Sequence, residues 1–398
     1  MTLIATWKYR NLPLFLGDIL VTSDVKQDVD IPIVRAVDVD IPLVQGINEM
    51  LRGKATFTVN ESKQKLCIMR DNLVTAWSGS YIQAHEVLSK LDQKFEGVRI
   101  TKEALIDFCE NLDPRRFDNV DLIFGVLNVR KQGDRIHSDV YRCSSFIKGV
   151  SFNHPIYDWV AVAGSGQKAF LDVLGKSEII FSKTGNDVGI ADIDDKNIFN
   201  AYQQALGLLS SFAGMECVSG GINIIDRWGG GYEIAFPVDR FYKMRDILHS
   251  FWFLKNNGQN DFSLHLFNKL YKIAYHEDLL IYYILDNFLV KPPTITFDTN
   301  LLLVPPILKR VDDYDFSDAS KIFNFEHKYL ATTLWDLSEG KINDVFFKVD
   351  ALPSEKSNIV IIIEGKKIGL AFKQQYLEEL VELCGKHFKK NVKKIVLG

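Results

Sequence analysis

The chain opens with Met1-Thr2-Leu3-Ile4-Ala5-Thr6-Trp7-Lys8-Tyr9-Arg10-Asn11-Leu12-Pro13-Leu14-Phe15-Leu16-Gly17-Asp18-Ile19-Leu20-Val21-Thr22. Two largely apolar stretches, residues 3–9 and 12–22, flank Arg10-Asn11, a pattern typical of a β-hairpin. A strand that begins directly at Thr2 would hold this residue against a sheet. We therefore take the hairpin as the element around which the rest of the chain is arranged.

Thr2, at the start of this hairpin, has the groups that a nucleophilic residue needs. Initiator methionines are removed when the second residue is small, so we expect the mature chain to begin at Thr2. A free α-amino group titrates near pH ~8 and can be neutral at working pH. It could then take the proton of the Thr2 hydroxyl and make Oγ1 a nucleophile. Because Met-Thr is also a common start of ordinary chains, the argument needs further residues.

Several later motifs occur in a fixed order after Thr2. Asp18 and Thr22 follow it by 16 and 20 positions, and Lys65 precedes two apolar stretches that end at Gly79. Further on come Gly164-Ser165-Gly166, after an apolar run, and Ser219-Gly220-Gly221, after a predicted helix. In order and spacing these motifs resemble the proteasome β subunits and the HslV-like bacterial peptidases. The resemblance covers about residues 2–250.

The resemblance implies a threonine-type peptidase with an N-terminal nucleophile and assigns roles to three residues around Thr2. The Lys65 ammonium would lower the pKa of the terminal amine, because a nearby positive charge disfavours a second one. Asp18 would orient Lys65, and the backbone N–H of Gly79 would face the developing oxyanion. Lys63 is the alternative if the alignment is shifted. Taken singly, Asp18 could equally be a turn residue and Lys65 a solvated strand end.

The same resemblance implies that Ser165 and Ser219 line the amine. The family has an Asp just before the second serine motif, and Glu216 stands at that position here, one methylene longer.

Four residues match the substrate groove of the family. Thr22 would hold an extended peptide through its backbone, and Trp77 would form the base of the pocket for the residue before the cut bond. Val21 and Tyr81 would form the walls of that pocket. Alternatively, Trp77 packs in the core.

Length and composition bound the remaining possibilities. The chain has 398 residues, 47% of them hydrophobic, and a net charge of −4, which is ordinary for a globular protein of two or three domains. The net charge gives no case for nucleic acid or membrane as a partner. Neither a transmembrane run nor a secretory signal is present, and the five scattered cysteines favour reduced thiols in the cytoplasm over a disulfide framework or zinc site. We expect no cofactor and no metal.

The order of predicted elements indicates an α+β fold: sheet hairpins, two helices, further hairpins, two helices and strands. The resemblance implies the four-layer αββα sandwich of N-terminal nucleophile hydrolases. The first of two domains would span residues 1–255 and include helices at Tyr81–Phe95 and 101–111. In the segment 23–64, two V-D-I-P-[IL]-V stretches at 29–34 and 39–44 are consistent with a pair of edge strands, or equally with a chance repeat in a short segment.

The last third matches no motif known to us. The polar stretch Asn256–Asn260 is a plausible linker, and residues 260–398 would form a smaller C-terminal α+β domain of unknown role. We predict a long helix at Phe262–Leu289, ended by Pro292-Pro293. Two strands at Asn358–Glu364 and Lys367–Phe372 and a helix at Gln374–Phe388 would follow.

Three functions remain open at this point. The leading hypothesis is a peptidase acting on a peptide or protein substrate, as a homo-oligomer. No G-x-x-x-x-G-K-[ST] motif is present, so an ATPase unfoldase would have to be another chain. The alternatives are an N-terminal nucleophile amidase for a small amide, and a non-catalytic interaction subunit with a proteasome-like fold. The presence of both Thr2 and Lys65 argues against the last.

Overall fold

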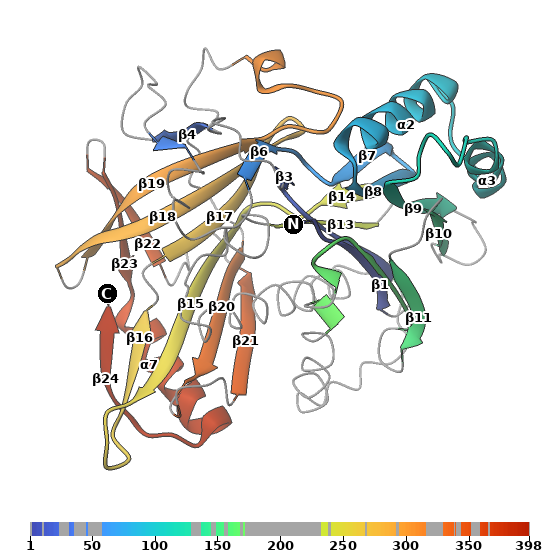
Figure 1. Ribbon diagram of the computed structural model, residues 1–398. Helices are drawn as coiled ribbons and strands as arrows, with labels where there is room; N and C mark the ends of the chain where they lie inside the picture. The colour runs from blue at the N-terminus through green and yellow to red at the C-terminus, as the bar shows by residue number, and fades with distance from the viewer. Residues whose placement is uncertain are drawn as a thin grey trace.

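The computed structural model describes residues 2–9, 12–23, 32–35, 45–46, 58–128, 137–144, 149–154, 158–167, 170–171, 232–237, 240–266, 269–291, 294–315, 329–337, 339, 344–351, 359–364 and 367–397. These residues form an α+β fold rich in antiparallel strands. Figure 1 shows two parts, with the chain start near the middle: sheets with α2 and α3 on one side, and a large sheet on the other.

The first part contains a sheet with six described strands in the order β11-β12-β1-β2-β13-β14. Its strands span Ile4–Tyr9 (β1), Leu12–Asp18 (β2), Val150–His154 (β11), Asp158–Ala163 (β12), Tyr232–Pro237 (β13) and Phe241–Lys243 (β14). The predicted hairpin is confirmed, because β1 and β2 pair antiparallel with Ile4 opposite Gly17. On its other edge β1 pairs with β12, where Ile4 lies opposite Ala163. Thr2 therefore lies two residues before a strand that is paired on both edges.

A second sheet packs against the first and carries the helices. Its described strands, in the order β10-β9-β8-β7, span Leu66–Arg70 (β7), Leu73–Gly79 (β8), Val120–Asn128 (β9) and His137–Ser144 (β10). Buried apolar side chains of both sheets form one cluster between them, including Ile4, Phe15, Val74 and Ile123. Burying apolar surface on the inner faces of two sheets is the main force that holds such layers together.

Helices α2 (Tyr81–Lys94) and α3 (Lys102–Glu110) confirm the two helices predicted there. Ser80 and Thr101 cap them: their hydroxyl oxygens accept hydrogen bonds from the N–H groups of Gln83 and Ala104. The apolar faces of both helices join a second cluster with β8 and β9. The layers described so far are thus helices, sheet and sheet. On the far face of the first sheet, the buried Trp7 ring packs against Phe170, 6.1 Å away between centroids.

The second part, which we call the C-terminal sheet, has twelve strands among the described residues. Its long central strands follow the order β21-β20-β15-β17-β18-β19-β23-β22, with β16 and β24 on one branch and β4 and β5 on another. The strands are β4 (Pro32–Arg35), β5 (Gln45–Gly46), β15 (Ile247–Asn256), β16 (Phe262–Leu266), β17 (Lys269–His276), β18 (Leu279–Lys291), β19 (Thr294–Val304), β20 (Tyr329–Asp336), β21 (Asp344–Ala351), β22 (Ile359–Glu364), β23 (Lys367–Phe372) and β24 (Val392–Leu397). A separate pair joins β3 (Leu20–Ser23) to β6 (Thr58–Ser62).

The long helix predicted at Phe262–Leu289 is wrong, because this segment forms β16, β17 and most of β18. Its apolar residues come in continuous runs, which fit a buried strand as well as a buried helix. The polar turn after His276, where Glu277 has a positive φ of 54°, breaks the run into a hairpin. The plausible linker at 256–260 is the turn between β15 and β16, where Asp261 N–H donates to the Gly258 carbonyl.

The other predictions for this region agree with the structure. Strands β22 and β23 lie within one residue of the predicted ranges, and α7 (Gln374–Leu383) continues into a π-helical turn at Cys384–Phe388. The buried Tyr376 of α7 packs against Trp252 and Phe372 of the sheet. Of the two V-D-I-P stretches, the first overlaps β4, which joins the C-terminal sheet through β19, and the second lies outside the described residues.

Candidate functional site

The backbone of Thr2 is held at the junction of three strands. Its N–H donates to the Ser165 hydroxyl oxygen at 2.8 Å, and its carbonyl accepts from the N–H of Gly166 at 3.0 Å. The next residue, Leu3, exchanges two bonds with Asp18: Leu3 N–H donates to Asp18 Oδ1 at 3.1 Å, and Asp18 N–H to the Leu3 carbonyl at 3.0 Å. The structure thus places Ser165 against Thr2 and Asp18 against the adjacent Leu3.

Gly164 allows this arrangement because its backbone touches that of Thr2. Its φ is +97°, a region that L side chains rarely adopt, and a Cβ there would lie 2.1 Å from the Thr2 carbonyl oxygen. A glycine at this position is therefore required for Ser165 to reach the Thr2 nitrogen.

Asp18 lies at the end of β2 and is buried, with a relative exposure of 1%. Burial raises the pKa of its carboxyl from 3.8 to about 7, and the nearby Lys65 ammonium and the Leu3 N–H oppose that rise. Its second oxygen, Oδ2, is buried without a hydrogen-bond partner among the described residues. A buried acceptor of this kind is suited to a cation, and Lys65 is the main positive charge acting on it.

Lys65 directly precedes β7 and is also buried. Its Nζ lies 3.9 Å from the centroid of the Trp77 ring, within the range of a cation–π interaction. Its backbone carbonyl accepts from Trp77 N–H at 3.0 Å. Its Cβ lies 2.8 Å from the position that a Cβ on Gly17 would occupy, so Gly17 gives Lys65 room beside Asp18. Lys65 is thus fixed between β2 and β8.

Lys63, the alternative to Lys65, is used elsewhere. Its Nζ donates to the backbone carbonyl of Lys309 at 2.6 Å, in the C-terminal sheet region. This contact favours Lys65 as the residue that acts with Asp18.

Gly79 ends β8, and Ser80 then begins the cap of α2, which is the strand–glycine–helix junction expected from the sequence. Its φ is +92°, and a Cβ would lie 2.0 Å from the Asn119 carbonyl oxygen, so glycine is required here too. Among the described residues, the hydrogen bonds of Thr2 go to Ser165 and Gly166 and not to Gly79.

The four residues assigned to a substrate groove lie near one another. Trp77 is fully buried, and its indole N–H donates to the Gln64 carbonyl at 2.9 Å, which favours the core interpretation. Tyr81 packs beside it at 6.1 Å between ring centroids, and Val21 packs partly buried against the same cluster. The backbone of Thr22 pairs with Val59, after a register shift in which Asn60 of β6 has no partner in the β3–β6 pairing.

Sequence reasoning missed Glu233, which β13 places opposite Gly17. It is fully buried, accepts from Leu66 N–H at 2.7 Å and pairs with Lys243 Nζ at 2.7 Å. Burial raises its pKa, while the Lys243 ammonium opposes the rise. The signal was a single acid inside the apolar strand Tyr232–Pro237, because a charged group is buried only where it has partners.

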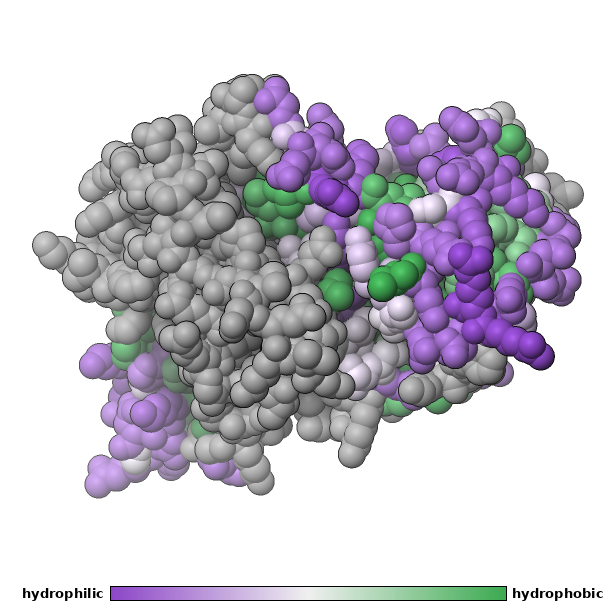
Figure 2. Space-filling model, turned by 45° about the horizontal axis from the view of Figure 1, so that its top comes forward, coloured by the Kyte–Doolittle hydropathy of each residue, from purple (hydrophilic) through white to green (hydrophobic). Residues whose placement is uncertain are grey.

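Glu216 and Ser219 lie outside the described residues. In the described part of the chain, no three His, Cys, Asp or Glu side chains gather in a way that could hold a metal ion. No helix among the described residues has the length and apolar character needed to cross a bilayer. The surface over α2 and α3 is largely hydrophilic, as Figure 2 shows in its upper right part.

The sequence matches no protein-family model and no curated protein.

Proposed function

We propose that this protein is a threonine-type peptidase of the N-terminal nucleophile class, with Thr2 as nucleophile once Met1 is removed. The observation that carries the proposal is the convergence on one strand end of the Thr2 nitrogen, the Ser165 hydroxyl and the buried Asp18–Lys65 charges. These groups come from segments far apart in sequence.

The proposed reaction uses the terminal amine as base. The amine takes the proton of Thr2 Oγ1 while this oxygen attacks the carbonyl carbon of the peptide bond. The tetrahedral intermediate collapses to an ester on Oγ1, and the amine passes the proton to the leaving nitrogen. Water then attacks the ester carbonyl and loses a proton to the amine. The acyl C–Oγ1 bond breaks, the amine returns the proton to Oγ1, and the carboxylic acid product leaves. Ser165 holds the amine, and Lys65, oriented by Asp18, keeps it neutral.

Gly79 is proposed as the oxyanion donor, through its backbone N–H. The support is the junction it occupies, with a positive φ and no room for a side chain. A backbone donor fixed between a strand and a capped helix cannot rotate away, which is the property that transition-state stabilisation needs.

For the fold, we propose the four-layer αββα sandwich. The two packed sheets and the α2 and α3 layer support it, as does Phe170, which covers the outer face of β1. We further propose a peptide or protein substrate and a homo-oligomer, with an ATPase unfoldase from another chain if substrates are folded.

The test compares the wild-type protein with Thr2→Ala and Thr2→Ser on a library of fluorogenic peptides and a panel of N-acyl amino acids. We expect Thr2→Ala to abolish hydrolysis while circular dichroism stays unchanged, and Thr2→Ser to keep part of it. Retained turnover in purified Thr2→Ala would refute Thr2 as the nucleophile. Turnover of the acyl amino acids alone would identify a small-amide amidase instead.

A further inference from the structure

Residues 62–64, which directly precede Lys65, attach to the C-terminal sheet and not only to their own sheet. Ser62 Oγ donates to the Leu303 carbonyl at 2.9 Å, and Gln64 N–H donates to the Pro305 carbonyl at 3.0 Å. Gln64 also forms a parallel bridge with Pro306. The segment that carries Lys65 therefore lies along the end of β19 and the residues after it.

Gln64 is the centre of this attachment. Its side-chain Nε2 donates to two carbonyls, that of Asp278 at 2.7 Å and that of Val304 at 2.6 Å. Its Oε1 accepts from Lys243, and its backbone carbonyl accepts from the Trp77 indole. The residue is fully buried, and each of its polar atoms has a partner.

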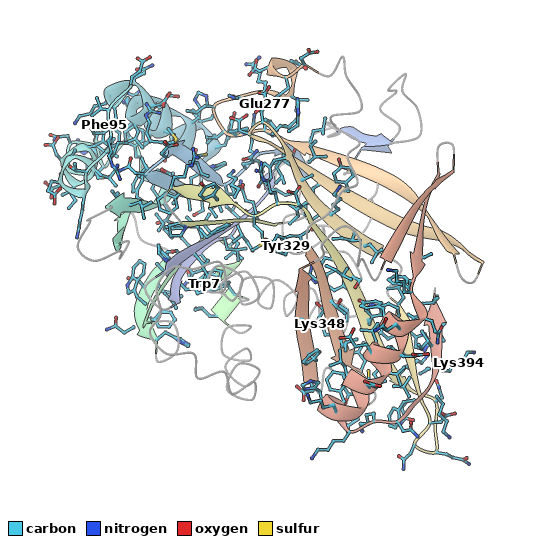
Figure 3. The ribbon with its side chains drawn as sticks, turned by 180° about the vertical axis from the view of Figure 1, so that it is seen from behind. Trp7, Phe95, Glu277, Tyr329, Lys348 and Lys394 are labelled. Carbon is cyan, nitrogen blue, oxygen red and sulfur yellow. The ribbon has the colours of Figure 1, made fainter. Side chains whose placement is uncertain are left out.

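These partners tie Gln64 to both supports of Lys65. Trp77 provides the ring under the Lys65 ammonium, and Lys243 pairs with Glu233, which holds the N–H of Leu66. The two carbonyl acceptors belong to the β17–β18 turn and the end of β19. Figure 3 shows Glu277, the neighbour of Asp278, at the tip of that hairpin, on the side toward the α2 and α3 layer.

We propose that Gln64 is a positioning residue through which the C-terminal sheet sets the place of Lys65, and with it the pKa of the Thr2 amine. This inference rests on the proposed function. Losing the two carbonyl bonds frees the segment before Lys65, and the ammonium moves away from the amine. Moving a cation from about 4 to about 6 Å at an effective dielectric constant of about 20 raises the amine pKa by about one unit.

Other charged groups face this region and contribute to its electrostatic potential. They are Asp18 on β2, Glu233 on β13, Lys243 on β14, and Asp278 and Lys309 beside the C-terminal sheet. The measurement must therefore report the pKa of the Thr2 α-amine itself. Trace acetylation of the Thr2 α-amine with acetic anhydride across pH, quantified by peptide mass spectrometry, does so without requiring turnover.

The experiment compares the wild-type protein with Gln64→Leu and Gln64→Asn. Leucine removes both donated bonds, and asparagine keeps the amide but is too short to reach both carbonyls. We expect the amine pKa to rise by about one unit in Gln64→Leu and by less in Gln64→Asn. Lys65→Ala, which removes the ammonium, serves as the reference and should raise the pKa at least as much.

The matched control is Lys348→Met, which breaks the 2.6 Å ion pair between β21 of the C-terminal sheet and Glu379 of α7. It should lower stability without moving the amine pKa, since this pair does not touch residues 62–65. An unchanged pKa in folded Gln64→Leu, or in Gln64→Asn if the leucine variant does not fold, overturns the inference. A pKa shift in Lys348→Met equal to that in the Gln64 variants overturns it as well.

Failure of the proposed function would look different. A wild-type protein that does not react with a leucine-based peptide epoxyketone defeats the proposed function and, with it, this inference. A wild-type protein that reacts, beside Gln64 variants of unchanged amine pKa, leaves the proposed function standing and defeats the inference alone.

Discussion

Asp18 combines two properties that pull in opposite directions. Its burial raises the carboxyl pKa to about 7. The ionised form, however, is the one that holds a lysine ammonium most strongly. The Leu3 N–H and the Lys65 ammonium recover part of the charge stabilisation that water would have given. A site that holds a carboxylate at this depth does so at the expense of stability, as functional sites often do.

The pH dependence of stability follows from this pKa. Between pH of about 4 and about 7, the unfolded chain loses the Asp18 proton while the folded chain keeps it, so the folded state binds more protons and loses stability as pH rises. Relative to Asp18→Asn, the wild-type free energy of unfolding should fall by up to about 4 kcal/mol over this range and then level off. Urea denaturation at several pH values checks it. If the free energy of unfolding changes with pH in the same way for both proteins, the raised pKa of Asp18 is contradicted.

The two lysines near β7 should behave differently. Lys65→Ala should lower turnover by roughly 10²-fold or more, because a positioned charge at a reacting centre typically contributes that much. Lys63→Ala, which breaks the bond to the Lys309 carbonyl, should cost less than about tenfold in turnover. Steady-state kinetics of both purified variants decide the point. If Lys65→Ala leaves turnover unchanged and Lys63→Ala lowers it strongly, Lys63 and not Lys65 has the catalytic role.

At the scale of elements, the turn after β12 positions Thr2. Gly164→Ala should reduce turnover strongly, because its Cβ would lie 2.1 Å from the Thr2 carbonyl oxygen. Gly258→Ala is the matched control: its φ is +103°, similar to the +97° of Gly164, but nothing lies within 4 Å of the added Cβ. Kinetics and melting curves of both variants separate backbone strain from the clash at Thr2. Equal losses of turnover would show that strain alone matters.

The sequence predicts elements well where local signals agree. The hairpin at Arg10-Asn11, the capped helices after Ser80 and Thr101, and the glycines at 79 and 164 each combine an apolar pattern with a turn or cap residue. The segment 262–289 lacks such agreement, since a continuous apolar run fits both a strand and a helix. Its strand state is decided by pairing with β15 and β19, which are distant contacts.

The site shows the same limit. Motif spacing led us to propose Thr2, Asp18, Lys65 and Ser165 as site residues, and in the structure the Thr2 nitrogen lies 2.8 Å from the Ser165 hydroxyl oxygen. Spacing could not identify Glu233 or Gln64, because their partners come from β14 and from the C-terminal sheet. A resemblance confined to the first 250 residues contains no information on contacts with the last third.

At the scale of the whole molecule, the two parts are interleaved and not arranged one after the other. Strand β4, from the segment after the first hairpin, pairs with β19 of the C-terminal sheet. Strand β15, which begins at Ile247, pairs with three other strands of that sheet. The C-terminal sheet thus takes strands from the sequence before Lys65 and from the sequence after it.

The central claim is that Thr2, with a free amine, is the nucleophile. While Met1 is attached, the Thr2 nitrogen is an amide and cannot act as a base. The most direct measurement is the intact mass of the purified, active protein before and after reaction with a leucine-based peptide epoxyketone, with the adduct mapped by peptide sequencing. We predict a chain that starts at Thr2 and one adduct, located on Thr2. An active preparation that fully retains Met1, or that carries its adduct on another residue, would contradict the account.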